Sequence, residues 1–130
     1  MKKLGIKEGF RAALVGEPTG FRRELEGLPD KVSFVSSVQR DLDFVLFFAR
    51  TQNELLRNFS RLAVKLVPTG MLWVAWPKKA SGLPTDLSDG AVRQIGLDAG
   101  LVDVKVCAVN EVWSGLKFVI RVKDRPRIPS

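Results

Sequence analysis

Histidine and tyrosine are absent from this 130-residue sequence, and cysteine occurs once, as Cys107. Without histidine, the chain offers no Ser-His-Asp triad, no Cys-His pair and no His-ligated metal. A single cysteine excludes an intramolecular disulfide, so the sequence requires no oxidising compartment. Any catalysis would fall to Asp, Glu, Lys, Ser, Thr or the single cysteine. We expect a cytoplasmic protein with no catalytic residues, no metal and no cofactor; whether it is an enzyme is left open, and a protein without catalytic activity is favoured.

Long hydrophobic runs are also missing. The densest runs, residues 44–49 and 71–76, are far shorter than the roughly 20 residues of a membrane-spanning helix, and no apolar signal sequence follows the basic start of the chain. The composition, 45% hydrophobic and 27% charged, is typical of a globular domain. We expect no membrane partner and one domain over residues 1–130, with a polar lead-in at 1–10 and a basic tail at 123–130.

The charge is biased towards one sign, with a formal net charge of +7 at pH 7. Most of the basic residues are dispersed, which favours solubility as the role of the charge. Two groups stand out: Arg57, Arg61 and Lys65, which share one face of a predicted helix, and the tail with Arg121, Lys123, Arg125 and Arg127. A nucleic-acid-binding protein that uses these two groups is therefore kept as an alternative.

Hydrophobic periodicity predicts alternating strands and helices. The expected strands are residues 11–16, 32–36, 43–49, 71–76, 102–109 and 116–122. The expected helices are a short one after Thr19 that buries Phe21, Leu25 and Leu28, a long one at 51–67, and one from about 86 or 88 to 97, with a turn at 68–70. This order predicts an α/β fold, a single Rossmann-like three-layer domain whose mainly parallel sheet has helices on both faces and ends in an antiparallel hairpin.

Ligands of such sheets bind at the carboxyl ends of the strands. The segment 16–20 lies where dinucleotide-binding folds carry a glycine-rich turn, but only Gly16 and Gly20 are glycines and Pro18 removes one amide donor. The next strand ends in two serines, without the acidic residue that binds a ribose. This pattern indicates a turn and a helix cap instead of a cofactor motif.

The loop after the strand at 71–76 is the better candidate. Lys78 and Lys79, beside Ser81 and close to a helix start near Asp86, are typical of a phosphate or carboxylate site, although the same residues also suit a solvated loop with ordinary caps. Near the link at 110–115, Trp113 and Lys117 are a possible stacking platform, or Trp113 is simply a core residue. The predicted ligand-binding residues are Lys78, Lys79, Ser81, Asp86, Trp113 and Lys117.

Cys107 lies in the middle of a predicted strand, where cysteines are commonly buried and inert. Lys105 falls on the same face of that strand, two residues away. An exposed Lys105 would lower the pKa of an exposed thiol, so a reactive Cys107 is a second hypothesis.

Two stretches resemble class I methyltransferases: the strand 43–48 with its following helix, and the run 66–74, which contains Pro68-Thr69-Gly70. In that family an L-x-P-G-G-x-L turn leads into the fifth strand, and Thr69 stands here for its first glycine. The resemblance covers roughly residues 40–122. It implies a methyltransferase-like sheet with a terminal antiparallel hairpin and a shortened cofactor half, which lacks one strand and one helix between Ser37 and Asp41.

The chain is also similar, along nearly its whole length, to a small bacterial family known as domain of unknown function 3052. The similarity is carried by residues 4–7, 76–79, 85–87 and 100–119, including Lys105-Val106-Cys107-Ala108-Val109 and Trp113-Ser114-Gly115-Leu116-Lys117. It implies a compact methyltransferase-like fold and supplies no activity.

The leading hypothesis is a non-catalytic methyltransferase-like domain that binds a small anionic ligand or a protein partner. One alternative is a minimal transferase dependent on S-adenosylmethionine or a nucleotide, with a pocket near Gly16 and Gly20. The nucleic-acid-binding protein is the other. A shortened sheet leaves an edge strand to be covered, and a homodimer is one way to cover it.

Overall fold

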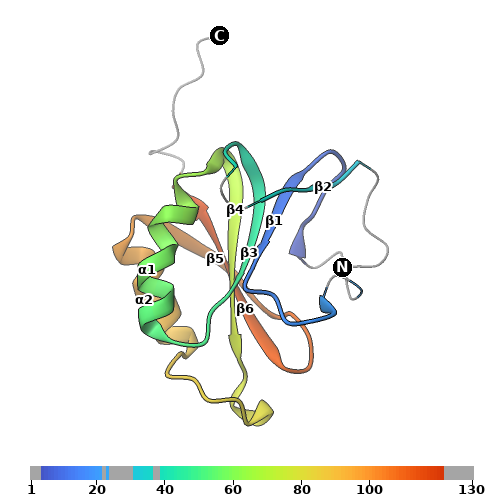
Figure 1. Cartoon of the computed structure of the whole chain (residues 1–130). Coiled ribbons are helices and arrows are strands. Elements are labelled where there is room, and N and C mark those ends of the chain that lie inside the picture. The colour runs from blue at the N-terminus through green and yellow to red at the C-terminus, as the bar shows by residue number, and fades with distance from the viewer. Residues whose placement is uncertain (1–3, 22, 24–30, 37–38, 122–130) are drawn as a thin grey trace.

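The computed structural model describes residues 4–21, 23, 31–36 and 39–121, which form a twisted sheet with helices packed beside it (Figure 1). The elements in chain order are β1 (Arg11–Val15), β2 (Ser33–Phe34), β3 (Leu42–Phe48), α1 (Gln52–Ala63), β4 (Leu66–Pro77), the short 3-10 helix η3 (Lys79–Ser81), α2 (Asp89–Asp98), β5 (Leu101–Ala108) and β6 (Trp113–Ile120). The strand order is β2-β1-β3-β4-β6-β5. The first four strands are parallel and β6 is antiparallel to both of its neighbours, so the predicted α/β class and terminal hairpin are confirmed.

β3 is the centre of the sheet because it is apolar on both faces and is paired on both sides, with β1 and β4. Every residue of β3 except Asp43 is buried. Asp43 is half-buried, and its carboxylate accepts a hydrogen bond from the backbone N–H of Arg11 at 2.9 Å. The continuous apolar run therefore predicted a central strand correctly.

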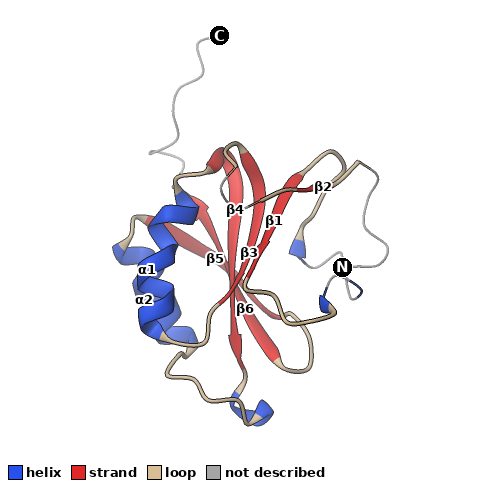
Figure 2. Cartoon of the chain, viewed as in Figure 1, coloured by secondary structure: helices blue, strands red, loops and turns tan. Residues whose placement is uncertain are grey.

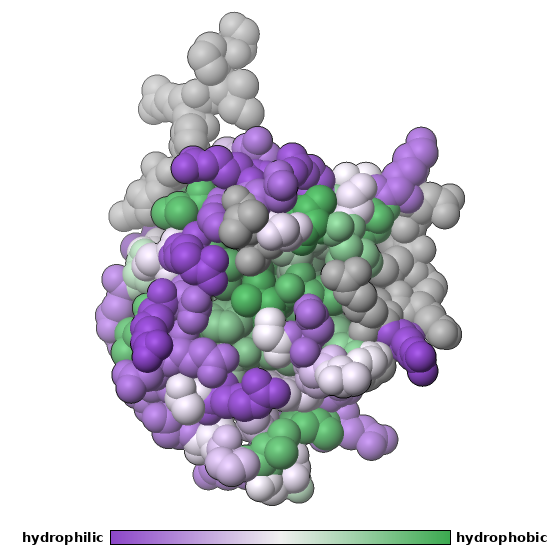
Figure 3. All heavy atoms as spheres, viewed as in Figure 1, coloured by the Kyte–Doolittle hydropathy of each residue, from purple (hydrophilic) through white to green (hydrophobic). Residues whose placement is uncertain are grey.

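Both described α-helices pack on one side of the sheet, which we call the helix face (Figures 1 and 2). α1 buries Leu55, Phe59 and Leu62, and the ring of Phe59 meets that of Phe118 edge to face, with 5.1 Å between centroids. Hydrophilic residues gather over the outer side of these helices (Figure 3). In the described part of the chain, no helix has the length and apolar character needed to cross a membrane.

The opposite side of the sheet, which we call the N-terminal face, is covered by the start of the chain. Leu4 and Ile6 are buried there although they belong to the expected polar lead-in. The indole Nε1 of Trp73 donates a hydrogen bond to the carbonyl oxygen of Leu4 at 2.9 Å. Phe21 is buried as predicted, whereas Leu25 and Leu28 of the predicted helix lie outside the described residues.

The long helix begins as predicted but ends earlier. The hydroxyl of Thr51 accepts a hydrogen bond from the N–H of Glu54 at 3.1 Å, which is the expected N-cap. The prediction of helix to residue 67 and a turn at 68–70 was wrong, because β4 already begins at Leu66, which pairs with Leu42. The register shifts after this pair, and a Cβ on Gly70 would lie 2.8 Å from the carbonyl oxygen of Leu42. The glycine therefore serves a close contact between strands.

Candidate functional site

The carboxyl edge of the parallel strands brings the three predicted segments to the same end of the molecule. The β5–β6 link lies there because Pro77, the last residue of β4, pairs with Trp113, the first of β6. The backbone N–H of Lys78 also donates to the carbonyl oxygen of Val112 at 2.8 Å. The link itself is a compact turn, in which Asn110 Oδ1 accepts hydrogen bonds from the N–H groups of Val112 and Trp113, each at 2.9 Å.

A recess of about 290 Å³ opens at the end of β4, beneath the start of α2, and we call it the lysine recess. It is lined by Trp76, Pro77, Lys78, Lys79, Leu87, Ser88, Asp89, Val106 and Ser114. Neither Lys78 nor Lys79 forms an ion pair with a described residue. Two of the six predicted ligand-binding residues therefore line a common recess and keep their charges available for an anion.

Ser81 shapes the loop that carries the lysines. Its hydroxyl donates to the carbonyl oxygen of Lys78 at 2.6 Å and accepts from the N–H of Leu83 at 3.2 Å. Gly82 follows with a φ of 76°, a left-handed conformation that favours glycine. Ser81 is not among the residues that line the lysine recess, so its observed contacts give it a positioning role in the loop.

Asp86 caps the helix before it in the chain, α1, and not the one that follows. Its Oδ1 accepts a hydrogen bond from the N–H of Gln52 at 2.7 Å, and the Gln52 side chain donates back to the carbonyl oxygen of Asp86 at 3.0 Å. Beside it, the hydroxyl of Thr85 donates to the carbonyl oxygen of Arg50 at 2.7 Å. These bonds fasten the loop between β4 and α2 to the start of α1, and Asp86 does not line the lysine recess.

The N-terminus of α2 is capped by its own residues. Ser88 Oγ accepts from the N–H of Ala91 at 3.2 Å, and Asp89 Oδ1 accepts from the N–H of Gly90 at 3.0 Å. Two of the N–H groups that a helix start offers to an anion are therefore already bonded. Anion binding in the lysine recess would depend mainly on the two lysines.

Trp113 and Lys117 do not join the lysine recess, because they lie on the N-terminal face. Trp113 is only 3% exposed and packs edge to face against Phe48, with centroids 5.0 Å apart. The guanidinium of Arg50 covers the Trp113 ring at 5.3 Å from its centroid. Lys117, four residues along β6, points to the same face and lies near Gly5. Trp113 is thus a core residue and offers no exposed stacking platform.

The C-terminal hairpin supplies the other side of the lysine recess, through Ser114 of the third predicted segment and through Val106, which the sequence did not predict. Ser114 stands opposite Trp76 in the β4–β6 pairing, and Val106 stands on the neighbouring strand opposite Leu116. Because side chains alternate between faces, Ser114 and Val106 project on the helix face with Trp76. The register of the β5–β6 hairpin places these two residues beside the lysines, and the sequence alone did not define that register.

A second hollow of about 410 Å³ lies at the end of β1, and we call it the strand-end cleft. It is lined by Glu17, Pro18, Thr19, Gly20, Phe21 and Arg23. Gly16 turns the chain with a φ of 69°, and a Cβ there would lie 3.0 Å from the carbonyl oxygen of Phe48. One carboxylate oxygen of Glu17, Oε2, is buried and has no hydrogen-bond partner in the described part of the chain.

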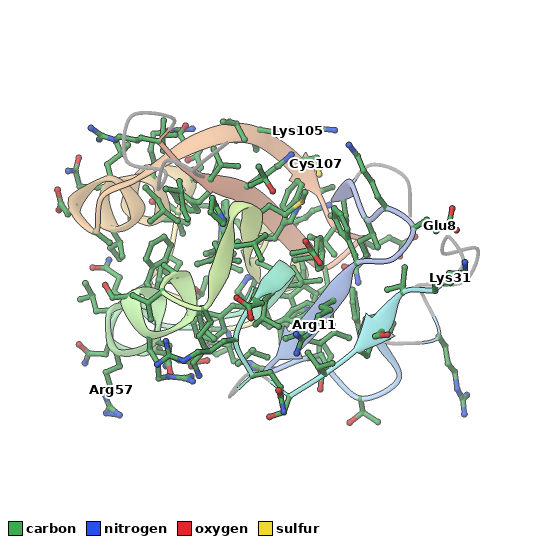
Figure 4. All side chains as sticks on the ribbon, turned by 90° about the horizontal axis from the view of Figure 1, so that it is seen from above. Glu8, Arg11, Lys31, Arg57, Lys105 and Cys107 are labelled. Atoms are coloured by element: carbon green, nitrogen blue, oxygen red, sulfur yellow. The ribbon has the colours of Figure 1, made fainter. Side chains whose placement is uncertain are left out.

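The basic stripe on α1 is less uniform than the sequence suggested. Arg57 is exposed and projects away from the helix (Figure 4), whereas the guanidinium of Arg61 donates to Asn58 Oδ1 at 2.8 Å. Lys65 lies beyond the end of α1 at Ala63, in the turn before β4. Of the basic tail, Lys123, Arg125 and Arg127 lie outside the described residues. Nucleic-acid binding stays a prediction.

Cys107 is a half-buried free thiol on β5. It pairs with Gly115, and Lys105 pairs with Lys117, so all three side chains, of Cys107, Lys105 and Lys117, project on the N-terminal face. Figure 4 shows Lys105 and Cys107 close together on β5. The predicted shared face of Lys105 and Cys107 is therefore confirmed, and the reactivity of the thiol stays a prediction. Within the described residues, no group of three or more cysteine, aspartate and glutamate side chains is placed to hold a metal ion.

No protein-family model matches the chain, and no curated protein matches its sequence. Solved structures do match its fold. An S-adenosylmethionine-dependent methyltransferase from Aquifex aeolicus superposes with a TM-score of 0.68 at 20% identity, covering 90% of this chain and 85% of that one. Fibrillarin from Aeropyrum pernix with bound S-adenosylmethionine has a TM-score of 0.59 at 13% identity, covering 92% of this chain and 70% of that one.

Magnesium protoporphyrin IX methyltransferase from Synechocystis PCC 6803, also with bound S-adenosylmethionine, matches with a TM-score of 0.57 at 13% identity, covering 89% of this chain and 72% of that one. The chain thus has a methyltransferase-like fold, as the resemblance in the sequence implied. At these identities the similarity establishes the fold, and function must be argued from the sites.

Proposed function

We propose that this chain is a non-catalytic domain of methyltransferase-like fold that binds a small anionic ligand in the lysine recess. The observation that carries the proposal is that Lys78 and Lys79 line one recess without an ion-pair partner among the described residues. Opposite unit charges about 4 Å apart attract by about 4 kcal/mol at an effective dielectric constant of about 20, the value typical near a protein surface. Two such lysines are the natural counter-charges for an anion.

The loop is organised before any ligand arrives, which supports binding as its role. Ser81 fixes the backbone of Lys78, and Thr85 and Asp86 hold the far end of the loop against α1. A ligand would therefore not have to order the loop, which reduces the entropic cost of association.

Replacing both lysines with glutamine should weaken the binding of small anions at least ten-fold, because the attraction of two charges is lost. Isothermal titration calorimetry with inorganic phosphate and small carboxylates measures this. The double substitution Lys7→Gln and Arg57→Gln removes the same charge from exposed positions outside the recess and is the control. Equal affinities for the two double variants would exclude the lysine recess. If no small anion binds the unaltered chain, a protein partner becomes the better hypothesis.

A minimal S-adenosylmethionine-dependent transferase is the second candidate, favoured by the fold and by the strand-end cleft. The cleft of about 410 Å³ has room for an adenosyl ligand, and the carboxylate of Glu17, which lines it, would accept a hydrogen bond from a ribose hydroxyl or an ammonium group. When bound, the cofactor would supply an activated methyl group. Pro18 has no backbone N–H to donate, and Ser36, which follows β2, is not an acidic residue that would bind the ribose. We therefore expect weaker cofactor binding than in a glycine-rich site.

Calorimetric titration with S-adenosylmethionine tests this candidate. If the strand-end cleft binds the cofactor, Glu17→Gln should reduce the affinity about ten-fold, because a charged acceptor is replaced by a neutral amide. The Lys78→Gln and Lys79→Gln double variant should bind as the unaltered chain does. The absence of heat at high concentrations of the cofactor would remove the candidate.

Several wider assignments belong to the same proposal. We infer from the sequence motifs that the chain is a member of the bacterial domain of unknown function 3052 family, acts in the cytoplasm and forms one domain over residues 1–130. A homodimer stays a proposal that fits the outer position of β5, on which Val104 and Val106 are 53% and 51% exposed.

A further inference from the structure

The walls of the lysine recess are of two kinds, and this narrows the chemistry of its ligand. Lys78 and Lys79 supply positive charge, while Trp76, Leu87 and Val106 supply apolar surface. We infer that the ligand is a monovalent carboxylate with an apolar body, such as an aromatic carboxylate, and not a phosphorylated compound. This inference rests on the proposed function of the same recess.

The apolar wall has an exposed part that a ligand would cover. Trp76 and Leu87 are 5% and 6% exposed, so they are already packed in the core, whereas Val106 is 51% exposed. Covering an exposed valine next to buried apolar side chains removes apolar surface from water, which favours binding of an apolar group. An anion without an apolar body would leave Val106 exposed to water and would gain none of this free energy.

The size of the recess points the same way. Its volume of about 290 Å³ is at the lower end of the roughly 300–1,000 Å³ typical of ligand pockets. A ligand with one ring or a short chain matches this volume, whereas a nucleotide would extend beyond it.

The charges of the recess favour a single negative charge. Lys78 and Lys79 contribute two positive charges and Asp89 one negative charge, which leaves a net charge of one. Asp89 repels a second negative charge on a ligand, and its bond to the N–H of Gly90 removes a donor that a phosphate would use. Ser88 likewise occupies the N–H of Ala91. A monovalent carboxylate therefore satisfies the lysines without a strong conflict with Asp89.

Four small molecules separate the contribution of the charge from that of the apolar body. Benzoate has both the charge and the ring, acetate the charge without the ring, benzamide the ring without the charge, and inorganic phosphate a higher charge. Titration of the full chain, followed by calorimetry, should show benzoate binding at least ten-fold more tightly than acetate, benzamide or phosphate. Phosphate binding that equals or exceeds benzoate binding would overturn the inference.

Two matched variants locate the effect. Val106→Asn removes the exposed apolar wall and should lower benzoate affinity to that of acetate, without changing the affinity for phosphate. Val104→Asn, at a position of similar exposure on the same strand but outside the recess, should leave benzoate binding unchanged. Equal benzoate binding by both variants would contradict the proposed apolar wall.

The Lys78→Gln and Lys79→Gln double variant distinguishes this inference from the proposed function. If phosphate binds best and the double variant loses this binding, the lysine recess is confirmed as an anion site, but the inference that its ligand is an apolar carboxylate is wrong. If none of the three anions binds, both are overturned. Benzoate binding that requires both Val106 and the lysines supports both.

Discussion

Replacing Gly96 with alanine should lower the free energy of unfolding by about 1–3 kcal/mol, the usual cost of overpacking a core. A Cβ at position 96 would lie only 2.0 Å from Cε1 and 2.4 Å from Cζ of the Phe118 ring. This ring is fully buried and already packs against Phe59, so it has little room to move. To admit the methyl group, α2 has to shift away from the sheet. That cost exceeds the gain of about 1 kcal/mol that alanine offers over glycine within a helix.

Gly90 provides the control in the same helix. A Cβ there would meet nothing within 4 Å, so Gly90→Ala should leave stability unchanged or raise it by up to about 1 kcal/mol. Urea unfolding of both variants, followed by circular dichroism, gives the comparison. Equal stabilities would mean that α2 does not approach β6 as closely as described.

Replacing Trp73 with phenylalanine should cost about 2–3 kcal/mol of unfolding free energy, from a lost buried hydrogen bond and a small cavity. Trp73 is fully buried, and its indole N–H is a donor to the carbonyl oxygen of Leu4. Phenylalanine fills most of the space but leaves that oxygen without this donor. Because the bond joins the N-terminal segment to the sheet, the segment should also detach more often. Trypsin cleavage after the exposed Lys7 should therefore become faster.

Trp76→Phe separates the two contributions. Trp76 packs in the core of the helix face and, among the described residues, forms no hydrogen bond to the N-terminal segment like that of Trp73. It should lose only the part of the stability that depends on ring volume, with an unchanged rate of cleavage after Lys7. Similar cleavage rates in both variants would show that the Trp73 bond does not hold the segment.

Local chemistry determined the elements that the sequence predicted well. The seven residues of β3 are all apolar except Asp43. The start of α1 follows from the N-cap, in which the hydroxyl of Thr51 accepts a hydrogen bond from the N–H of Glu54. The Ser88 cap of α2 is of the same kind. Such features depend on residues a few positions apart, so they can be predicted from sequence alone.

The errors arose where distant residues decide the outcome. Leu66 and Gly70 belong to a strand because Leu66 pairs with Leu42 and Gly70 packs against the carbonyl oxygen of Leu42. No local sequence pattern indicates these contacts. For the candidate site, the loop position of Lys78 and Lys79 was predictable. The separation of Trp113 and Lys117 from them was not, because it depends on which face of β6 each side chain occupies.

The strand order also bears on how the chain folds as it is synthesised. β6, the last of the described strands in chain order, lies inside the sheet between β4 and β5. Until residue 120 has left the ribosome, β5 therefore has no described strand beside it, and α2 lacks the Phe118 surface against which Gly96 packs. Leu4 likewise waits for Trp73, which lies 69 positions later in the chain. Leu4 and β5 thus both reach their final places only after later segments of the chain have been made.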